Sequence, residues 1–230
     1  MNSASVQPEP TSREKIMQSA ERLFGGHGYD GVSVRDIASD AQVNSALIGY
    51  YFGGKEGLLA EVYTRRCEVL KADRAQLLDS YQEGGRTPTL EEVLDAFITP
   101  SLAAAGDVQG GRSFSHLRAI LSAENSSLLE RLVAQTFDES SKVFVDTLCK
   151  CLPHLTREDV FWRFHFLLGT IYYTATGPHR IKTLSRGRCD PSNPAATKEQ
   201  LIPFLAAAFR SPAVPKKRQR ALAAKGSKRK

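Results

Sequence analysis

The chain has 230 residues, which allows one large domain or a small domain joined to a larger one. Hydrophobic residues make up 41% and charged residues 24%, and no stretch reaches the roughly 18 uninterrupted apolar residues that a membrane span needs. We therefore expect neither a membrane protein nor, without an apolar N-terminal segment, a secreted one, and we expect a cytoplasmic location. The four cysteines have no zinc-site or disulfide-framework spacing, so no metal and no cofactor are expected.

The formal net charge of +6 is unevenly distributed along the chain. Eight basic residues and no acidic ones follow residue 210, which leaves the first 210 residues with a net charge of −2. We predict that residues 211–230 form a disordered basic tail, which either attracts phosphates without sequence preference or only improves solubility. Residues 1–11 are polar, contain two prolines and are predicted to form a disordered arm.

Helix-start signals follow one another in the first third of the chain. A capping-box pattern at Thr11 precedes apolar residues at helical spacing, which predicts a first helix ending at the glycines of residues 25–28. Ser33 begins a second short helix, and Asn44 begins a third. From Lys55 a longer helix is predicted to run into the low 80s.

Further capping boxes predict helices that begin at Thr89, Thr156 and Thr197. No segment shows the sustained period-two alternation of a strand. The sequence therefore predicts an all-α fold.

Residues 33–55 have the spacing of two short helices that cross at a tight turn. A helix-turn-helix needs a small residue where the helices touch and apolar anchors on the second helix. Ala38 supplies the small contact, and Val43 and Ile48 supply the anchors. The turn residue that is usually a left-handed glycine is here Gln42, at a cost of roughly 1 kcal/mol.

The N-terminal quarter of the sequence resembles the TetR/AcrR family of one-component transcriptional regulators. The matching elements are residues 23–24, 28–29, 33–38, 43–44, 51–52 and 54–59. Residues 43–52 and 162–169 are further similar to the PsrA-type branch, whose members respond to fatty acids. The resemblance implies a three-helix DNA-binding domain with the helix-turn-helix at residues 12–57, and a larger helical domain for ligand binding and dimerisation at residues 58–210.

The resemblance also implies which side chains meet a double-stranded DNA operator. A helix of residues 44–51 is about 12 Å long and fits a major groove about 12 Å wide. In the family, Tyr50 corresponds to a backbone-contacting residue and Lys55 to a phosphate clamp, whereas Arg35 either touches phosphate or pairs with a nearby carboxylate. The predicted DNA-binding residues are Ser33, Arg35, Asn44, Ser45, Ala46, Tyr50 and Lys55.

The charge of this module does not by itself attract DNA, because residues 1–57 carry five basic and seven acidic side chains. Binding must then depend on the placement of the charges, on helix N-termini and on the basic tail. Gly49 stands where the family often has a tyrosine, and glycine has no side chain to make that backbone contact.

The helix predicted after Thr156 is apolar on two sides. One stripe contains His165 and the other contains Phe166, so one side can pack on the protein's own body and the other on a partner. Together with a last helix at residues 198–209 it resembles the four-helix dimer interface of the family. The predicted interface residues are Trp162, Phe166, Gly169, Tyr173, Leu205 and Phe209.

A ligand cavity in the family's usual place would be lined by aromatic and aliphatic residues of the larger domain, although such residues more often form ordinary core. The candidates are Phe97, Leu117, Leu121, Phe137, Phe144 and His165. The resemblance to the PsrA-type branch implies an acyl-CoA or a fatty acid as the ligand.

The sequence is therefore interpreted as a homodimeric repressor that a small hydrophobic effector releases from a palindromic operator. The alternative is a nucleic-acid-binding protein without sequence preference, driven by the basic tail. We expect no enzyme and assign no catalytic residue, because the sequence has no GxSxG, HExxH or glycine-rich phosphate-binding motif.

Overall fold

The computed structural model describes residues 10–106, 114, 115, 117, 118 and 127–214. Within these ranges the regular elements are helical, as the sequence predicts, and no helix has the length and apolar character needed to cross a membrane. The elements are α1 (Ser12–His27), α2 (Val34–Asp40), α3 (Ala46–Phe52), α4 (Lys55–Tyr81), the short 3-10 helix η1 (Glu83–Gly85), α5 (Leu90–Gly106), α7 (Ser127–Cys151), α8 (Arg157–Thr176), α9 (Pro178–Leu184) and α10 (Pro194–Arg210).

Side-chain caps determine where most of the predicted helices begin. The hydroxyl groups of Thr11, Ser33 and Thr156 each accept from the backbone N–H three residues ahead, and the acidic residue at that position accepts from the cap in return. Thr89 makes the same reciprocal bonds with Glu92 at the start of α5. Each box satisfies backbone donors that the first helical turn leaves without a partner.

The predicted start at Thr197 is wrong. The first residue of α10 is Pro194, and the side chain of Asn193 caps the helix by accepting from the N–H of Ala196 at 3.2 Å. Thr197 lies inside the helix, where its hydroxyl donates to the carbonyl of Pro191 at 3.1 Å. An Asn-Pro pair starts the helix earlier because proline has the helical φ already and lacks the N–H that the first turn could not bond.

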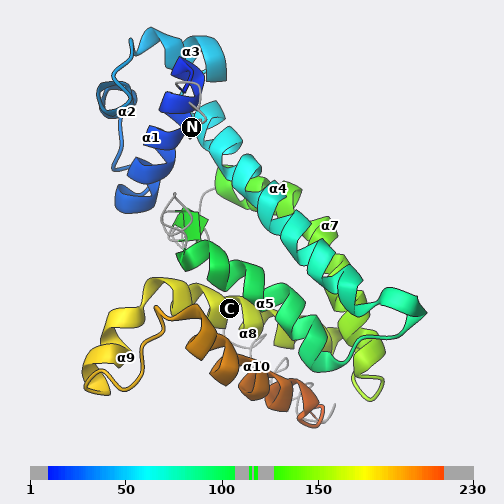
Figure 1. Ribbon diagram of the computed structural model, residues 1–230. Coiled ribbons are helices and arrows are strands. Elements are labelled where there is room, and N and C mark those ends of the chain that lie inside the picture. Colours follow the sequence, from blue (N-terminus) through cyan, green and yellow to red (C-terminus); the bar gives the residue numbers. More distant parts are fainter. Residues whose placement is uncertain (1–9, 107–113, 116, 119–126, 215–230) are drawn as a thin grey trace, which may run out of the picture.

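Helix α4 joins the N-terminal unit to the body of the protein. Figure 1 shows α1–α3 gathered at the N-terminal end of α4, which then runs beside α7, while α5 packs against α4, α7, α8 and α10. Leu58 and Leu59 at the start of α4 are buried with the core of α1–α3, and Leu78 near its end is buried with α5, α8 and α10. The expected boundary after residue 57 therefore falls in the first turn of a continuous helix.

Helix α8 buries a different stripe from either of the two that the sequence suggests. Phe164, Leu167 and Ile171 are buried against the body. The prediction that His165 lines an internal cavity is wrong, because its ring is exposed and contacts those of Trp162 and Phe166. At 3.6 residues per turn, the Phe166 stripe lies nearly opposite the buried one, and the His165 stripe lies between these two sides.

Helix α10 also presents a face other than the predicted one. Leu205 and Phe209 are buried in the protein's own core and cannot form the surface of a dimer interface, whereas Phe204 is exposed. Arg210 holds the end of α10 to α5 by donating to both carboxylate oxygens of Glu91, at 2.6 and 2.7 Å. Tight packing of α10 on α5 therefore uses the residues that the sequence assigns to a partner.

Candidate nucleic-acid interface

Helix α3 has one buried face and one exposed face. Ile48 and Phe52 are buried against α1 and α4 and anchor the helix. Ser45, Ala46 and Gly49 are exposed, and the Tyr50 side chain is 80% exposed. A large aromatic side chain held in solvent on a well-anchored helix is available for a macromolecular contact.

The turn before α3 has the strained geometry that the motif requires. Gln42 has a φ of 55°, in the left-handed region, and the N–H of Val43 donates to the carbonyl of Ala38 at 3.0 Å. The N-cap of α3 is Ser45, whose side chain makes no capping bond, so the helix begins at Ala46 rather than at the predicted Asn44. The Asn44 side chain accepts from the N–H of Ala46 at 2.9 Å. The turn therefore aims the first residues of α3 outward.

Two glycines bring the start of α4 against the end of α3. Gly53 terminates α3 in the left-handed conformation, with a φ of 72°. A Cβ at Gly57 would lie 1.9 Å from the carbonyl oxygen of Phe52, so only glycine permits this close approach. Lys55, the first residue of α4, is half-buried, and its Nζ lies 4.0 Å from the ring centroid of Tyr29. The packing thus places a lysine and a helix N-terminus beside α3.

The remaining positive charges of the unit divide into paired and exposed side chains. Arg13 forms an ion pair with Glu61, and Arg22 forms one with Asp40. Arg35 is exposed, and within the described ranges it forms no ion pair, so the reading in which it pairs with a nearby carboxylate has no support there.

Ser33 is the N-cap of α2, two residues before Arg35. Its hydroxyl accepts from the Asp36 N–H at 3.2 Å, and its own N–H donates to the Asp36 carboxylate at 2.8 Å. These bonds from the Ser33 side chain and backbone lower the pKa of Asp36. The Ser33 oxygen is thus already used as the acceptor of a helix cap, whereas its O–H is the group that can donate to a phosphate oxygen.

The residues predicted to line a ligand cavity belong to two adjoining cores. Leu117 and Phe137 are buried in the core that includes α1–α3, whereas Phe97 and Phe144 are buried in the core around α5, with their ring centroids 4.9 Å apart. Leu121 lies outside the described residues. The structure brings four of the candidates into the interior but does not gather them around one described cavity.

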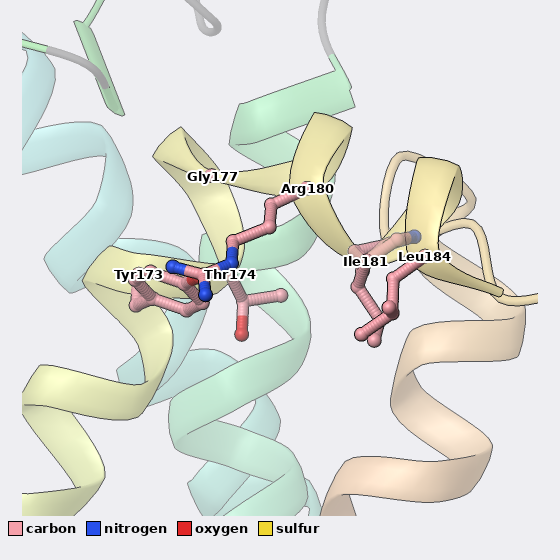
Figure 2. A pocket seen from close by; sticks show the side chains of 7 residues that line it. Tyr173, Thr174, Gly177, Arg180, Ile181 and Leu184 are labelled. Atoms are coloured by element: carbon pink, nitrogen blue, oxygen red, sulfur yellow. The ribbon is translucent and has the colours of Figure 1, made fainter.

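A pocket of about 290 Å³ lies elsewhere, at the junction of α8 and α9. Figure 2 shows the Arg180 side chain extending from α9 toward Tyr173 and Thr174 of α8, with Ile181 and Leu184 on the other side. Sequence reasoning missed this pocket because it did not foresee α9, a single short helix without an apolar periodicity of its own.

An apolar surface remains exposed on α8 and α10. The side chains of Trp162, Phe166, Tyr173 and Phe204 are between 56% and 63% exposed. Gly169 lies on α8, and a Cβ added there would have no neighbour within 4 Å. A group of large exposed apolar side chains on a folded chain commonly marks an interaction surface.

Two family models match the chain. Residues 16–62 match the family described as bacterial regulatory proteins, tetR family, and residues 95–208 match the tetracyclin repressor-like C-terminal domain. The probable HTH-type transcriptional regulator YttP of Bacillus subtilis is 51% identical over 49 residues, which are 21% of this chain and 24% of YttP. The chain spans between 24% and 48% of the length of the curated relatives that it matches.

Solved structures share the fold over most of the chain at low sequence identity. The fatty acid degradation regulator FadR from Bacillus halodurans has a TM-score of 0.59 at 17% identity, over 85% of this chain and 96% of that one. FadR from Bacillus subtilis in complex with stearoyl-CoA has a TM-score of 0.55 at 20% identity, over 83% of this chain and 96% of that one. With the turn at Gln42, the exposed face of α3 and both matched domains, the chain belongs to the TetR family of bacterial regulatory proteins.

Proposed function

We propose that this protein is a homodimeric repressor that binds a palindromic DNA operator through α3 and is released by an acyl-CoA or a fatty acid. The observation that carries the proposal is the exposed face of α3, with Ala46 and Tyr50 on it and Lys55 beside it. A seven-residue helix is about 10 Å long and can enter a major groove about 12 Å wide. In this proposal residues 12–57 form the DNA-binding domain and residues 58–210 the ligand-binding and dimerisation domain.

Each predicted contact has a physical role in this proposal. Asn44, Ser45 and Ala46 meet phosphates or base edges with the first turn of α3, and the Ala46 methyl group can contact only an apolar group such as the thymine methyl. Tyr50 packs on the sugar-phosphate backbone. Lys55 and Arg35 contact phosphates as point charges, and the N-terminus of α4 adds to the attraction.

Dimerisation supplies the symmetry that a palindromic operator needs. We assign the dimer interface to the exposed apolar surface of α8 and α10. Burying these aromatic side chains against their copies removes them from water, and Gly169 leaves room for a partner backbone to approach.

The identity of the effector is the most specific part of the proposed function. It rests on the similarity of residues 43–52 and 162–169 to the PsrA-type branch, and the stearoyl-CoA complex of FadR is a property of that relative. Release then works through α4, which runs unbroken from the DNA-binding unit into the body. An effector that prefers a dimer with the wrong spacing of its two α3 helices needs about 1.4 kcal/mol of differential binding to lower operator affinity tenfold.

Selection from a pool of random DNA duplexes tests the proposal, because it lets the protein choose its own operator sequence. We expect the full-length protein and a chain truncated after Ser211 to enrich the same palindromic sequence, with the truncated chain binding it more weakly and with a shallower salt dependence. Enrichment of no sequence by either form contradicts the proposal. Loss of all binding on truncation supports the tail-driven alternative instead.

Point variants then test the face of α3. On the selected duplex, we expect Tyr50→Ala to weaken binding about tenfold, and Lys55→Ala to weaken it and to reduce the salt slope by about 1. Lys142→Ala removes a charge that α7 exposes beside Glu139, and it serves as the matched control. Dissociation of Tyr50→Ala or Lys55→Ala into monomers would count against these roles, because both residues lie far along the chain from the proposed dimer interface.

A further inference from the structure

A positively charged side chain lies in the interior of the helical body. Arg74 is on α4, in a buried stripe with Leu70 and Leu78, and it is 3% exposed. Its Nε donates to the carbonyl of Phe97 at 3.1 Å, and its Nη2 donates to the hydroxyl of Ser101 at 2.7 Å. The guanidinium carbon lies 3.6 Å from the ring centroid of Phe97. These contacts with α5 orient the guanidinium but supply no negative charge.

A second arginine is directed at the same place. Arg118 is 5% exposed, and its Nη2 donates to the hydroxyl of Tyr172 on α8 at 3.3 Å. The guanidinium carbons of Arg74 and Arg118 lie 6.0 and 4.6 Å from the ring centroid of Phe137 on α7. Burial lowers the pKa of Arg74 well below its ordinary value, and the positive charge of Arg118 lowers it further. The two positive charges repel each other in the protein interior, and an anion bound to both would relieve this repulsion.

Among the described residues, the groups that face Arg74 provide no such anion. They are Arg118, Tyr172 and Cys67, and burial raises the pKa of the Cys67 thiol to about 12, so the thiol is neutral near pH 7. No aspartate or glutamate forms an ion pair with Arg74 in the ranges that the structure describes. Buried charges are normally paired, so a charged side chain without a counter-ion in a protein interior indicates a bound ligand of opposite sign.

The surroundings of the two arginines are aromatic. The ring of Tyr63 on α4 lies 5.8 Å from that of Phe114 and 6.3 Å from that of Phe137, measured between centroids. These rings come from segments far apart in the sequence and converge where the two cores adjoin. The site therefore combines forked hydrogen-bond donors, which match carboxylate or phosphate oxygens, with a wall that suits an apolar chain.

We propose, on the basis of the proposed function, that the effector is an amphipathic anion whose carboxylate or phosphate group is bound by Arg74 and Arg118, with its acyl chain against the neighbouring aromatic side chains. Arg74 and Lys55 lie on the same helix. An anion that binds the Arg74 guanidinium therefore exerts a force on α4, the helix whose first turn lies at the DNA-binding face. The anion is thus the part of the ligand that is coupled most directly to α4.

Three ligands with the same twelve-carbon chain test the proposal: dodecanoate, dodecanoyl-CoA and dodecanol. Their binding to the full-length protein is measured by isothermal titration calorimetry, and operator affinity without ligand is measured on the same samples. We expect at least one anionic ligand to bind at least tenfold more tightly than dodecanol. Binding of dodecanoate alone identifies a carboxylate as the recognised group, and binding of dodecanoyl-CoA alone identifies a phosphate.

Variants assign the preference to the arginines. We expect Arg74→Gln to weaken binding of the anionic ligand at least tenfold and to raise at least tenfold the ligand concentration needed to release the operator. Arg157→Gln removes an exposed arginine that pairs with Asp146 on the same body, and it should leave both unchanged. If Arg74→Gln does not fold, Arg74→Lys, which keeps the charge but loses the forked geometry, should retain the preference for the anion at lower affinity.

Three results overturn the proposal: dodecanol binds as tightly as the anions, Arg74→Gln keeps the full preference, or none of the three ligands binds the wild-type protein. In each case, retained operator binding leaves the DNA-binding part of the proposed function standing. If the ligand-free wild-type protein binds no operator, that result contradicts the proposed function itself.

Discussion

Gln42 shows how a single residue can carry strain within a motif. Its φ of 55° is a conformation that side chains with a Cβ disfavour by roughly 1 kcal/mol. The turn is nevertheless held, because Ala38 and Ala41 on one side and Ile48 on the other are buried in one core. Packing on both sides of the turn therefore imposes a geometry that Gln42 alone would not adopt.

The strain at Gln42 gives a direct prediction. We expect Gln42→Gly to raise the free energy of unfolding by about 0.5–1 kcal/mol, because glycine adopts this φ without a steric penalty. Urea denaturation measures the change. Gln18→Gly, at an exposed position inside α1, is the matched control and should lower stability by about 1 kcal/mol. A loss of stability in Gln42→Gly would show that the glutamine side chain has a role beyond the backbone geometry.

At the scale of elements, caps decide where the helices begin. The cap of α5 includes an ion pair between Glu92 and Arg86. The Glu92 carboxylate accepts from both Nη atoms of Arg86, at 2.8 and 2.7 Å, and from the N–H of Thr89 at 2.8 Å. The bonds from Arg86 and Thr89 lower the pKa of Glu92 from 4.5 to about 2. The start of α5, against which α4 and α10 pack, thus depends on an ionised carboxylate.

This cap predicts a pH dependence of stability. The pKa of Glu92 is lower in the folded than in the unfolded chain, so its contribution is complete above about pH 4.5 and is lost as the pH falls toward 2. We expect Glu92→Gln to reduce the dependence of unfolding free energy on pH between these values. Glu158→Gln, in the exposed first turn of α8, is the control. An unchanged profile in Glu92→Gln would contradict the assignment.

At the scale of the whole molecule, helices α8 and α10 expose large aromatic side chains. Trp162, Phe166 and Tyr173 of α8 and Phe204 of α10 are exposed, although α8 and α10 pack on each other and on α5 through other residues. Helix α4 lies between this body and the DNA-binding unit (Figure 1). The proposed dimer therefore sets the distance between two copies of α3 through α4.

The dimer proposal is tested by charge at the centre of the apolar surface. We expect Phe166→Glu to give a folded monomer, because two carboxylates would face each other across the symmetric interface, and operator affinity should fall with the loss of the second half-site contact. Light scattering after size-exclusion chromatography measures the mass. Val143→Glu, at an exposed residue of α7 that is not part of this surface, should remain a dimer. A monomeric wild-type protein would overturn the proposal itself.

The sequence by itself determined the features that depend on neighbours along the chain: the all-helical fold, the helix starts at Thr11, Ser33 and Thr156, the long helix from Lys55 and the left-handed turn at Gln42. Caps and turns are made of residues a few positions apart, so the sequence alone predicts them.

Only the tertiary structure decided which face of each helix is buried. The exposure of His165, the burial of Leu205 and Phe209 and the convergence of Arg74 with Arg118 depend on how α4, α5, α8 and α10 pack. One sequence signal could have indicated the burial of Arg74: it lies four residues after Leu70 and four before Leu78, on the apolar face of the same helix. Helices that are apolar on several sides can pack in more than one orientation, and contacts between residues distant in the chain select the one that forms.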